Sequence, residues 1–362
     1  MKLLIGIGHP AHVHFFKNFI DIFQKKGHEI MIIARDKEVT RDLLEKYNFK
    51  FELFGGHKQS MVAKFLEIPQ NDFQFYQAVK KFKPDILIGI NNYTSAHVGA
   101  LTRKPSIIFT DTEEAPLANI VTFPFATTIC TPSCFLKDLG KKQVRYQGYH
   151  ELAYLHPKYF TPDSGVLDQL GISKGENYFL LRFISWAASH DIGLSGMRMD
   201  TITTLIKSFE DRGLVFISSE RPLNPILEKY RLKISPEYIH SLMYFASLYM
   251  GEGGTMAAEA AMLGTPAIHI ESNANGIATG NFSGNFRELR DKYGLLYFYA
   301  NQNEAFSKAS EILENKNSKQ EWRKKLENLL NDKVDVTAWM TDFIENFPDS
   351  FSQYKEEHQV LK

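Results

Sequence analysis

The feature that most constrains the fold is an alternation of short apolar segments with amphipathic segments of helical period, which occurs twice along the chain. In the first half, the segments that predict strands are Lys2–Ile7, Glu29–Ala34, Phe49–Phe54, Ile86–Ile90, Ser106–Phe109 and Thr127–Cys130. The first helix is predicted from about His14 to Lys26, where phenylalanine and isoleucine recur at helical spacing. Strands that alternate with crossover helices are typical of a parallel sheet covered by helices on both faces. The first half therefore predicts a doubly wound α/β lobe, with Thr127–Cys130 as its last full strand.

The alternation stops between residues 146 and 162, where Gly148, Pro157 and Pro162 interrupt it, and then it starts again. The strands predicted in the second half are Tyr178–Arg182, Leu214–Ser218, Leu248–Met250, Pro266–Ile270 and Leu295–Tyr299. A chain of 362 residues is also long enough for two domains of ordinary size. We therefore expect a first lobe over residues 1–160, a second lobe over 161–335, and a C-terminal helix over 336–362 that crosses back to the first lobe.

The composition excludes several classes of protein. The 42 basic and 42 acidic residues balance, which argues against a dedicated nucleic-acid-binding protein. The two cysteines, Cys130 and Cys134, are too few for a disulfide framework or a structural zinc site. No apolar run approaches the length of about 18 residues that crosses a bilayer, and the apolar start is too short for a signal peptide. We expect a cytoplasmic protein.

Charge is distributed unevenly along this neutral chain. Residues 1–165 carry a formal net charge of +5 and eight of the 12 histidines. A basic first lobe favours contact with an anionic acceptor, or peripheral contact with the inner face of a membrane. Scattered, solvated lysines would give the same charge without any such partner.

The loop after the first strand, Gly6-Ile7-Gly8-His9-Pro10-Ala11-His12-Val13-His14, is the first candidate site. Because ligands of parallel α/β folds bind at the carboxyl ends of the strands, His9, His12 and His14 are candidate cleft residues. The glycines partly match a dinucleotide-binding pattern, but Pro10 removes a backbone donor within it and no carboxylate follows about 20 residues later. The three histidines also allow a zinc hydrolase, which would need a single barrel rather than two lobes.

The second candidate site is Gly251-Glu252-Gly253-Gly254-Thr255, which leads from a short strand into the helix predicted over Thr255–Leu263. Glycines at a helix start let a ligand approach the free backbone N–H groups, which attract anions. Glu259 follows one turn later among alanines. Its carboxylate could accept hydrogen bonds from a ribose diol, or it could face solvent without any function. The P-loop pattern of kinases and ATPases does not occur here.

The second segment carries a family resemblance. Gly251–Pro266 resembles the donor-binding segment of the N-acetylglucosaminyltransferase that completes lipid II. That enzyme belongs to the GT-B superfamily, which groups nucleotide-sugar glycosyltransferases with nucleotide-sugar 2-epimerases. The resemblance implies that Gly253, Gly254 and Thr255 bind the phosphates of the donor and that Glu259 binds its ribose.

The chain as a whole, over roughly residues 1–300, resembles domain-of-unknown-function family 354, whose proteins are GT-B-like. The matching segments are His9–Phe16, Gly253–Met256, Glu259–Ala261 and Leu263–Ala267. Within the first of them, Ala11-His12-Val13 resembles the Gly-Gly-His loop of the lipid II enzyme, although Pro10 and Ala11 replace its two glycines. The resemblance implies an α/β, GT-B-like fold of two doubly wound Rossmann-like lobes with an interlobe cleft, and it places His12 at that cleft.

Other polar residues follow predicted strands. Arg182 leaves the first strand of the second lobe, where its guanidinium group could bind a diphosphate. Asp111 follows a strand of the first lobe and could orient His12 or bind acceptor hydroxyls. Further candidate cleft residues, two of which could line the pocket for the nucleotide base, are His190, Glu220 and His240.

These features predict glycosyl transfer from a nucleotide-sugar donor to a carbohydrate or lipid-linked acceptor, in the synthesis of surface polysaccharide or glycoconjugates. The second lobe would bind the donor, while Arg182 and the helix start at Gly253–Thr255 would stabilise its diphosphate leaving group. His12 would take the proton of the acceptor hydroxyl. Neither a metal nor a cofactor is expected. A nucleotide-sugar 2-epimerase or hydrolase remains an alternative, as does a protein that binds nucleotide sugars without turnover.

Overall fold

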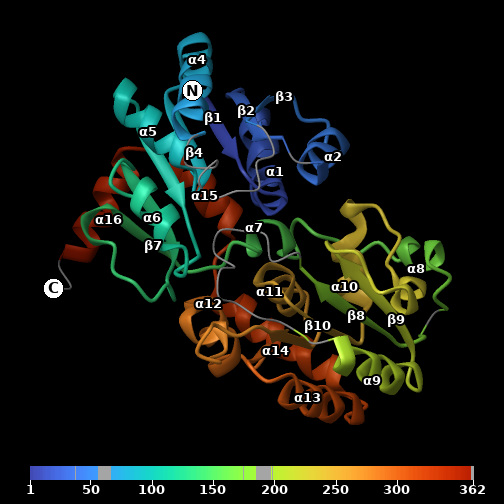
Figure 1. Ribbon diagram of the computed structural model, residues 1–362. Helices are drawn as coiled ribbons and strands as arrows, with labels where there is room; N and C mark the ends of the chain where they lie inside the picture. Colours follow the sequence, from blue (N-terminus) through green and yellow to red (C-terminus); the bar gives the residue numbers. More distant parts are fainter. Residues whose placement is uncertain (37, 56–66, 174, 185–196, 198, 360–362) are drawn as a thin grey trace. The chain divides into compact units, whose positions relative to one another are not determined.

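The computed structural model describes residues 1–36, 38–55, 67–173, 175–184, 197 and 199–359 of the chain. These residues form two compact units, which are considered one at a time (Figure 1). Unit 1 comprises Met1–Tyr154 together with Lys333–Lys362, and unit 2 comprises Leu155–Asp332. The boundaries expected at residues 160 and 335 lie a few residues from these.

Unit 1 contains a seven-stranded sheet of strand order β3-β2-β1-β4-β5-β6-β7, in which all neighbouring strands are parallel. Its strands are β1 (Lys2–Ile7), β2 (Glu29–Arg35), β3 (Phe51–Phe54), β4 (Ile86–Ile90), β5 (Ser106–Phe109), β6 (Thr128–Pro132) and β7 (Gln143–Tyr146). The central strands β1 and β4 consist almost entirely of isoleucine, leucine and glycine, because helices cover both of their faces. The doubly wound lobe predicted for the first half is confirmed.

The helices of unit 1 include two from the end of the chain, α15 and α16, where a single helix was expected. They are α1 (Pro10–Lys25), α2 (Glu38–Lys46), α4 (Ile68–Phe82), α5 (Tyr93–Thr102), α6 (Pro116–Thr122), η1 (Gly140–Lys142), α15 (Val336–Glu345) and α16 (Asp349–Gln359), with α7 (Leu152–Leu155) at the boundary of the unit. Helix α1 supplies much of the core, since its apolar stripe contains four phenylalanines that are almost fully buried: Phe15, Phe16, Phe19 and Phe23.

Two predictions for unit 1 are wrong in detail. The strand at Thr128–Pro132 is not the last one, because β7 pairs with it at the edge of the sheet, where a half-polar sequence is tolerated. Helix α1 begins at Pro10 rather than near His14. Proline is favoured in a first helical turn, and His9 caps this helix by accepting a hydrogen bond from Ala11 N–H on Nδ1 at 3.2 Å.

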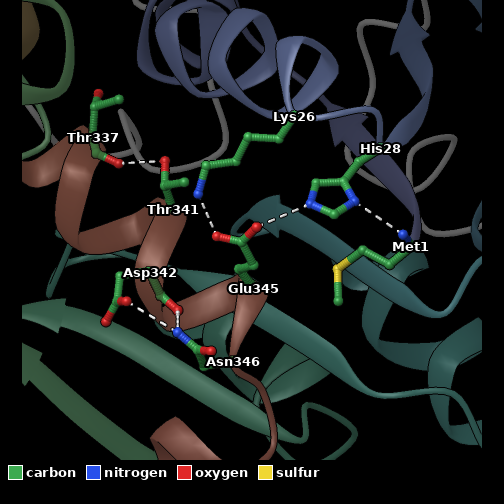
Figure 2. A network of polar contacts seen from close by, with 8 residues as sticks. All are labelled: Met1, Lys26, His28, Thr337, Thr341, Asp342, Glu345 and Asn346. Atoms are coloured by element: carbon green, nitrogen blue, oxygen red, sulfur yellow. Dashed lines mark hydrogen bonds and ion pairs between the residues drawn. The ribbon is translucent and has the colours of Figure 1, made fainter.

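The C-terminal helix α15 packs against α1, and polar contacts join its end to the start of the chain (Figure 2). Glu345 accepts a hydrogen bond from Lys26 and lies 3.1 Å from His28 Nε2, while His28 Nδ1 lies 3.0 Å from the amino group of Met1. Lys26 and His28 together lower the pKa of Glu345. These contacts join α15 to the first strand and helix of unit 1.

Unit 2 contains a five-stranded parallel sheet of strand order β12-β11-β10-β8-β9. Its strands are β8 (Tyr178–Phe183), β9 (Leu214–Ser219), β10 (Leu248–Gly251), β11 (Ala267–Ile270) and β12 (Leu296–Tyr299). Its helices are α8 (Gly165–Gln169), α9 (Met199–Glu210), η2 (Pro225–Tyr230), η3 (Pro236–Tyr238), α10 (Ile239–Phe245), α11 (Gly254–Met262), η4 (Thr279–Phe282), α12 (Gly284–Asp291), α13 (Gln302–Glu314) and α14 (Ser318–Asp332). The second doubly wound lobe is therefore also confirmed. In neither unit is a described helix long and apolar enough to span a membrane.

Candidate functional site

The glycine-rich segment of unit 2 lies where the strand order reverses. From β8 the chain moves outward to β9, and it then returns to the other side of β8 as β10. In open α/β sheets this reversal opens a crevice at the carboxyl ends of the two neighbouring strands, and ligands bind there. The ends in question are Arg182 on β8 and Gly251 on β10, which are paired in the sheet.

The start of α11 depends on its glycines. Gly253 precedes the helix with a φ of 81°, which favours glycine, and a Cβ there would lie 2.9 Å from Ile184 Cγ2. A Cβ on Gly251 would lie 2.5 Å from Arg182 Cβ. No side chain among the described residues caps the helix, and Thr255 in its first turn is exposed. This helix start therefore presents backbone N–H groups that no side chain of the described residues caps, and such groups attract anions.

Arg182 pairs in the sheet with Gly251, just before this helix start, and its side chain is held at the end of β9. Its Nη1 donates to Ser218 Oγ at 2.9 Å, and its Nη2 pairs with Glu220. Two predicted candidates, Arg182 and Glu220, are thus brought together as an ion pair. Only 17% of the Arg182 side chain is exposed, so its orientation is set by these partners.

Glu259 and His240 are also brought together. Glu259 lies on α11 and His240 on α10, and Glu259 Oε1 is 3.0 Å from His240 Nε2. Both side chains are at most 5% exposed, so the reading of Glu259 as a solvent-facing residue is wrong. The remaining candidate of this half, His190, lies outside the described residues.

Glu252 is a buried polar residue of this site that the sequence analysis did not select. Its side chain accepts hydrogen bonds from the backbone N–H of Ile184 at 3.0 Å and of Met197 at 2.8 Å, and Arg221 lies 3.3 Å away. Burial raises the pKa of Glu252, and Arg221 opposes that shift. The residue joins the end of β8 to the glycine turn. The only feature of the sequence that could have indicated Glu252 is its position, as a charged residue between two glycines at the end of a strand.

In unit 1, the three histidines of the first loop have different surroundings. His12 Nδ1 accepts a hydrogen bond from Gly8 N–H at 3.2 Å, whereas His9 is the exposed cap of α1. His14 is buried, with Nδ1 3.3 Å from Tyr47 Oη and its ring stacked on Tyr154. No group of three or more candidate ligands that could hold a metal occurs within the described parts of the chain.

The reversal of strand order in unit 1 lies between β1 and β4, and Asn92 fills it. Asn92 caps α5 by accepting a hydrogen bond from Ser95 N–H at 2.8 Å. Its side chain lies so close to β1 and β4 that a Cβ on Gly6 would be 2.5 Å from Asn92 Nδ2, and one on Gly89 2.6 Å from Asn92 Cβ. Sequence reasoning missed Asn92, although it is the second residue after a buried strand.

Asp111 lies at the carboxyl end of β5 and faces His150, which follows β7. Asp111 Oδ2 is 3.3 Å from His150 Nδ1, and Asp111 Oδ1 accepts a hydrogen bond from Thr112 at 3.1 Å. Burial lowers the pKa of His150, against the effect of Asp111, so the ring is neutral near pH 7. Because His150 lies in the segment read as a linker, it was not among the predicted residues.

Two proteins with similar sequences match different shares of this chain. An uncharacterised protein of Methanocaldococcus jannaschii is 26% identical over 282 residues, which cover 74% of this chain and 81% of that protein. The UDP-N-acetylglucosamine--N-acetylmuramyl-(pentapeptide) pyrophosphoryl-undecaprenol N-acetylglucosamine transferase of Halothermothrix orenii is 30% identical over 139 residues. That match covers 36% of this chain and 38% of the transferase.

In structure, the chain is similar to UDP-GlcNAc 2-epimerase from Neisseria meningitidis bound to UDP-GlcNAc. The TM-score is 0.67 with 13% identity, over 95% of this chain and 99% of the epimerase. At this identity the similarity shows the fold alone, which is the GT-B-like fold of two α/β lobes. The sequence also matches the family described as "Protein of unknown function (DUF354)" over residues 1–336.

Proposed function

The chain belongs to the DUF354 family, and we propose that it is a glycosyltransferase-like enzyme that moves a sugar from a nucleotide-sugar donor to a carbohydrate or lipid-linked acceptor. One observation carries the proposal: the uncapped, glycine-lined start of α11 lies at the reversal of strand order in unit 2, with Glu259 on the same helix. Such a helix start can bind the phosphates of a nucleoside diphosphate, and a nearby carboxylate can accept a hydrogen bond from its ribose.

The donor would bind to unit 2. Its diphosphate would accept hydrogen bonds from the backbone at Gly253, Gly254 and Thr255 and would be neutralised further by Arg182. Glu259, whose Oε1 lies 3.0 Å from His240 Nε2, would accept the hydrogen bond of a ribose hydroxyl on its carboxylate. His240 thereby orients the carboxylate. Neither step needs a metal, because the charge that develops on the leaving diphosphate meets fixed N–H donors.

The transfer step uses unit 1 as the source of the base. The acceptor oxygen attacks the anomeric carbon, the bond from that carbon to the diphosphate breaks, and the proton of the acceptor hydroxyl passes to His12. Since Nδ1 accepts the Gly8 N–H, Nδ1 holds the lone pair of the neutral ring, and proton uptake there would replace the Gly8 bond. Asp111 would accept hydrogen bonds from other hydroxyls of the acceptor.

Sequence similarity favours transfer over epimerisation. The transferase of H. orenii is 30% identical over its matched part, whereas the N. meningitidis epimerase is 13% identical and shares the fold. A 2-epimerase or hydrolase that uses the same donor site is the second candidate, because the structural similarity to the epimerase covers 95% of this chain. Turnover separates both from a protein that only binds nucleotide sugars.

Contact with a membrane surface is part of the proposal for the acceptor. On α6 and just beyond it, Leu117, Ile120 and Phe125 are 45%, 68% and 48% exposed, in a first part of the chain that carries a net positive charge. Exposed apolar side chains together with basic residues favour anionic lipid surfaces. Sedimentation with anionic vesicles, against vesicles of neutral lipid, tests this contact.

The first experiment measures thermal stabilisation by UDP, GDP, CMP and dTDP and by their sugar conjugates. A ligand that binds the folded protein and is present at a hundredfold excess over its Kd should raise the stability by about 2.7 kcal/mol. Release of free nucleotide from the sugar conjugate that binds is then measured with and without candidate acceptors. Release that requires an acceptor supports transfer, and release without one supports hydrolysis. Inversion at C2 of the sugar without release supports a 2-epimerase, and binding without release or inversion contradicts an enzyme.

A further inference from the structure

A buried histidine of unit 2 lacks hydrogen-bond partners. His269 lies in β11 and is 2% exposed, and neither Nδ1 nor Nε2 has a hydrogen-bond partner among the described residues. Glu271 Oε2 lies 3.7 Å from Nε2, which is too far for a hydrogen bond. Because an imidazole ring always carries at least one N–H, a buried donor is left unused. Buried polar groups are nearly always paired, so this one points to a missing acceptor.

His269 shares a row of the sheet with the two residues at the strand reversal. Gly251 is paired with Arg182 on one side and with His269 on the other. Residues at the same register of neighbouring parallel strands direct their side chains to the same face of the sheet. Gly251 has no side chain, so Arg182 and His269 are the nitrogen-bearing groups on either side of it.

That face is the one on which α11 begins. The ring of Phe286 packs edge-to-face on His269, with 5.0 Å between the ring centroids. The same ring reaches the first residue of the helix, since Phe286 Cζ would lie 3.2 Å from a Cβ on Gly254. One aromatic side chain therefore contacts both the unpartnered imidazole and the uncapped helix start.

We propose that His269 is a phosphate-binding residue of the donor site. One imidazole N–H would donate to a diphosphate oxygen that lies near Gly251, between Arg182 and the first turn of α11. The groups gathered there are backbone N–H groups, a guanidinium and an imidazole, all of which can donate hydrogen bonds to the oxygens of a phosphate. This inference rests on the proposed function, because it assigns a further residue to the same donor.

The experiment compares uridine, UMP and UDP by titration calorimetry on the wild-type protein and on His269→Ala. In the wild type the affinity should rise from uridine to UDP. In His269→Ala the UDP affinity should fall tenfold to a hundredfold, the size expected for a hydrogen bond to a charged group, while uridine affinity stays unchanged. His97→Gln is the matched control, since His97 is a histidine of unit 1 that lies 2.8 Å from Asp72, and its UDP affinity should equal the wild type.

The outcomes separate this inference from the proposed function. Equal UDP affinity in the wild type and His269→Ala overturns the inference alone, and so does an equal loss for uridine and UDP, which would mean a structural role. A wild-type protein that binds none of UDP, GDP, CDP, dTDP and ADP overturns both proposals. If His269→Ala does not fold, the ring ¹⁵N resonance of His269, assigned with His269→Asn, decides: it should move on addition of UDP and not of uridine, and an unmoved resonance overturns the inference.

Discussion

Glu259 and His240 form a buried pair in unit 2, with 3.0 Å between Glu259 Oε1 and His240 Nε2. The two residues are 19 positions apart, on α11 and α10, and both side chains are at most 5% exposed. Glu259 therefore has two roles: its contact with His240 stabilises unit 2, and its carboxylate is the group proposed to bind the ribose. A substitution at Glu259 should therefore change both folding and nucleotide binding.

Glu259→Ala should destabilise the protein by about 1–3 kcal/mol, because it leaves the His240 ring buried without its acceptor. It should also abolish the thermal stabilisation by the nucleotide that binds the wild type. Glu259→Gln is the control, since its amide oxygen can still accept from His240. Urea unfolding and the thermal shift check both effects, and full nucleotide binding by Glu259→Ala would exclude Glu259 from the site.

Gly253→Ala should prevent nucleotide binding. A Cβ at this position would meet Ile184 Cγ2 at 2.9 Å, and the φ of 81° is unfavourable for alanine by about 1–2 kcal/mol. Gly276→Ala separates the effect of the positive φ from that of the steric clash. Gly276 has a φ of 71°, but nothing lies within 4 Å of the added carbon. We expect Gly276→Ala to lower the melting temperature by a few degrees and to bind nucleotide normally. Equal binding by both variants would contradict the role of the Gly253 turn.

His12→Ala should lower transferase turnover by about 10²–10⁴-fold, the usual contribution of a general base, without changing the Kd for the nucleotide. His358→Ala is the control, because His358 is an exposed residue near the end of α16. Steady-state kinetics, with an acceptor that the nucleotide-release experiment identifies, provide the measurement. Unchanged turnover in His12→Ala would remove His12 from the mechanism and leave the donor site untouched.

Lys319 should make stability depend on pH in the alkaline range. Burial, with a smaller effect of Arg323, lowers the pKa of Lys319 from 10.5 to about 8, and its Nζ donates to Phe245 O at 2.5 Å. Between these two values the unfolded chain binds the proton and the folded chain does not, so the free energy of unfolding gains a contribution that rises with pH. Lys319→Met should lose this contribution. Urea unfolding from pH 7 to 10.5 is the test, and parallel curves for the two proteins would contradict the prediction.

Much of the fold follows from local patterns. Buried parallel strands are short apolar runs, and the sequence places Lys2–Ile7, Ile86–Ile90 and Ser106–Phe109 with the bounds observed for β1, β4 and β5. The edge strand β7 escapes the same rule, because one side of it lacks a neighbouring strand and half of its residues are polar. The start of α1 was misplaced because histidine is an unusual helix cap, although Pro10 is well suited to a first turn.

The site residues of unit 2 differ in whether neighbouring residues in the sequence or distant segments determine their contacts. The glycine turn and Glu259 belong to one continuous segment, so spacing along the chain was enough to predict an anion site at the start of α11. The partners of Glu252 are the backbone groups of Ile184 and Met197, which are 68 and 55 residues away. The sequence did not predict His269 as a site residue. Its proposed role in phosphate binding depends on its register with Gly251 and on the absence of a hydrogen-bond partner within the described residues.

The sequence by itself determined two parallel α/β lobes and the place of the glycine-rich helix start, because hydrophobic period and glycine content act over a few neighbouring residues. Only the tertiary structure decided which polar groups meet: Glu259 with His240, Arg182 with Glu220, and Asp111 with His150. Those pairs depend on strand order and register, which bring distant segments to one edge of a sheet. Buried polar groups are nearly always paired, and no local pattern encodes which partner a given group finds.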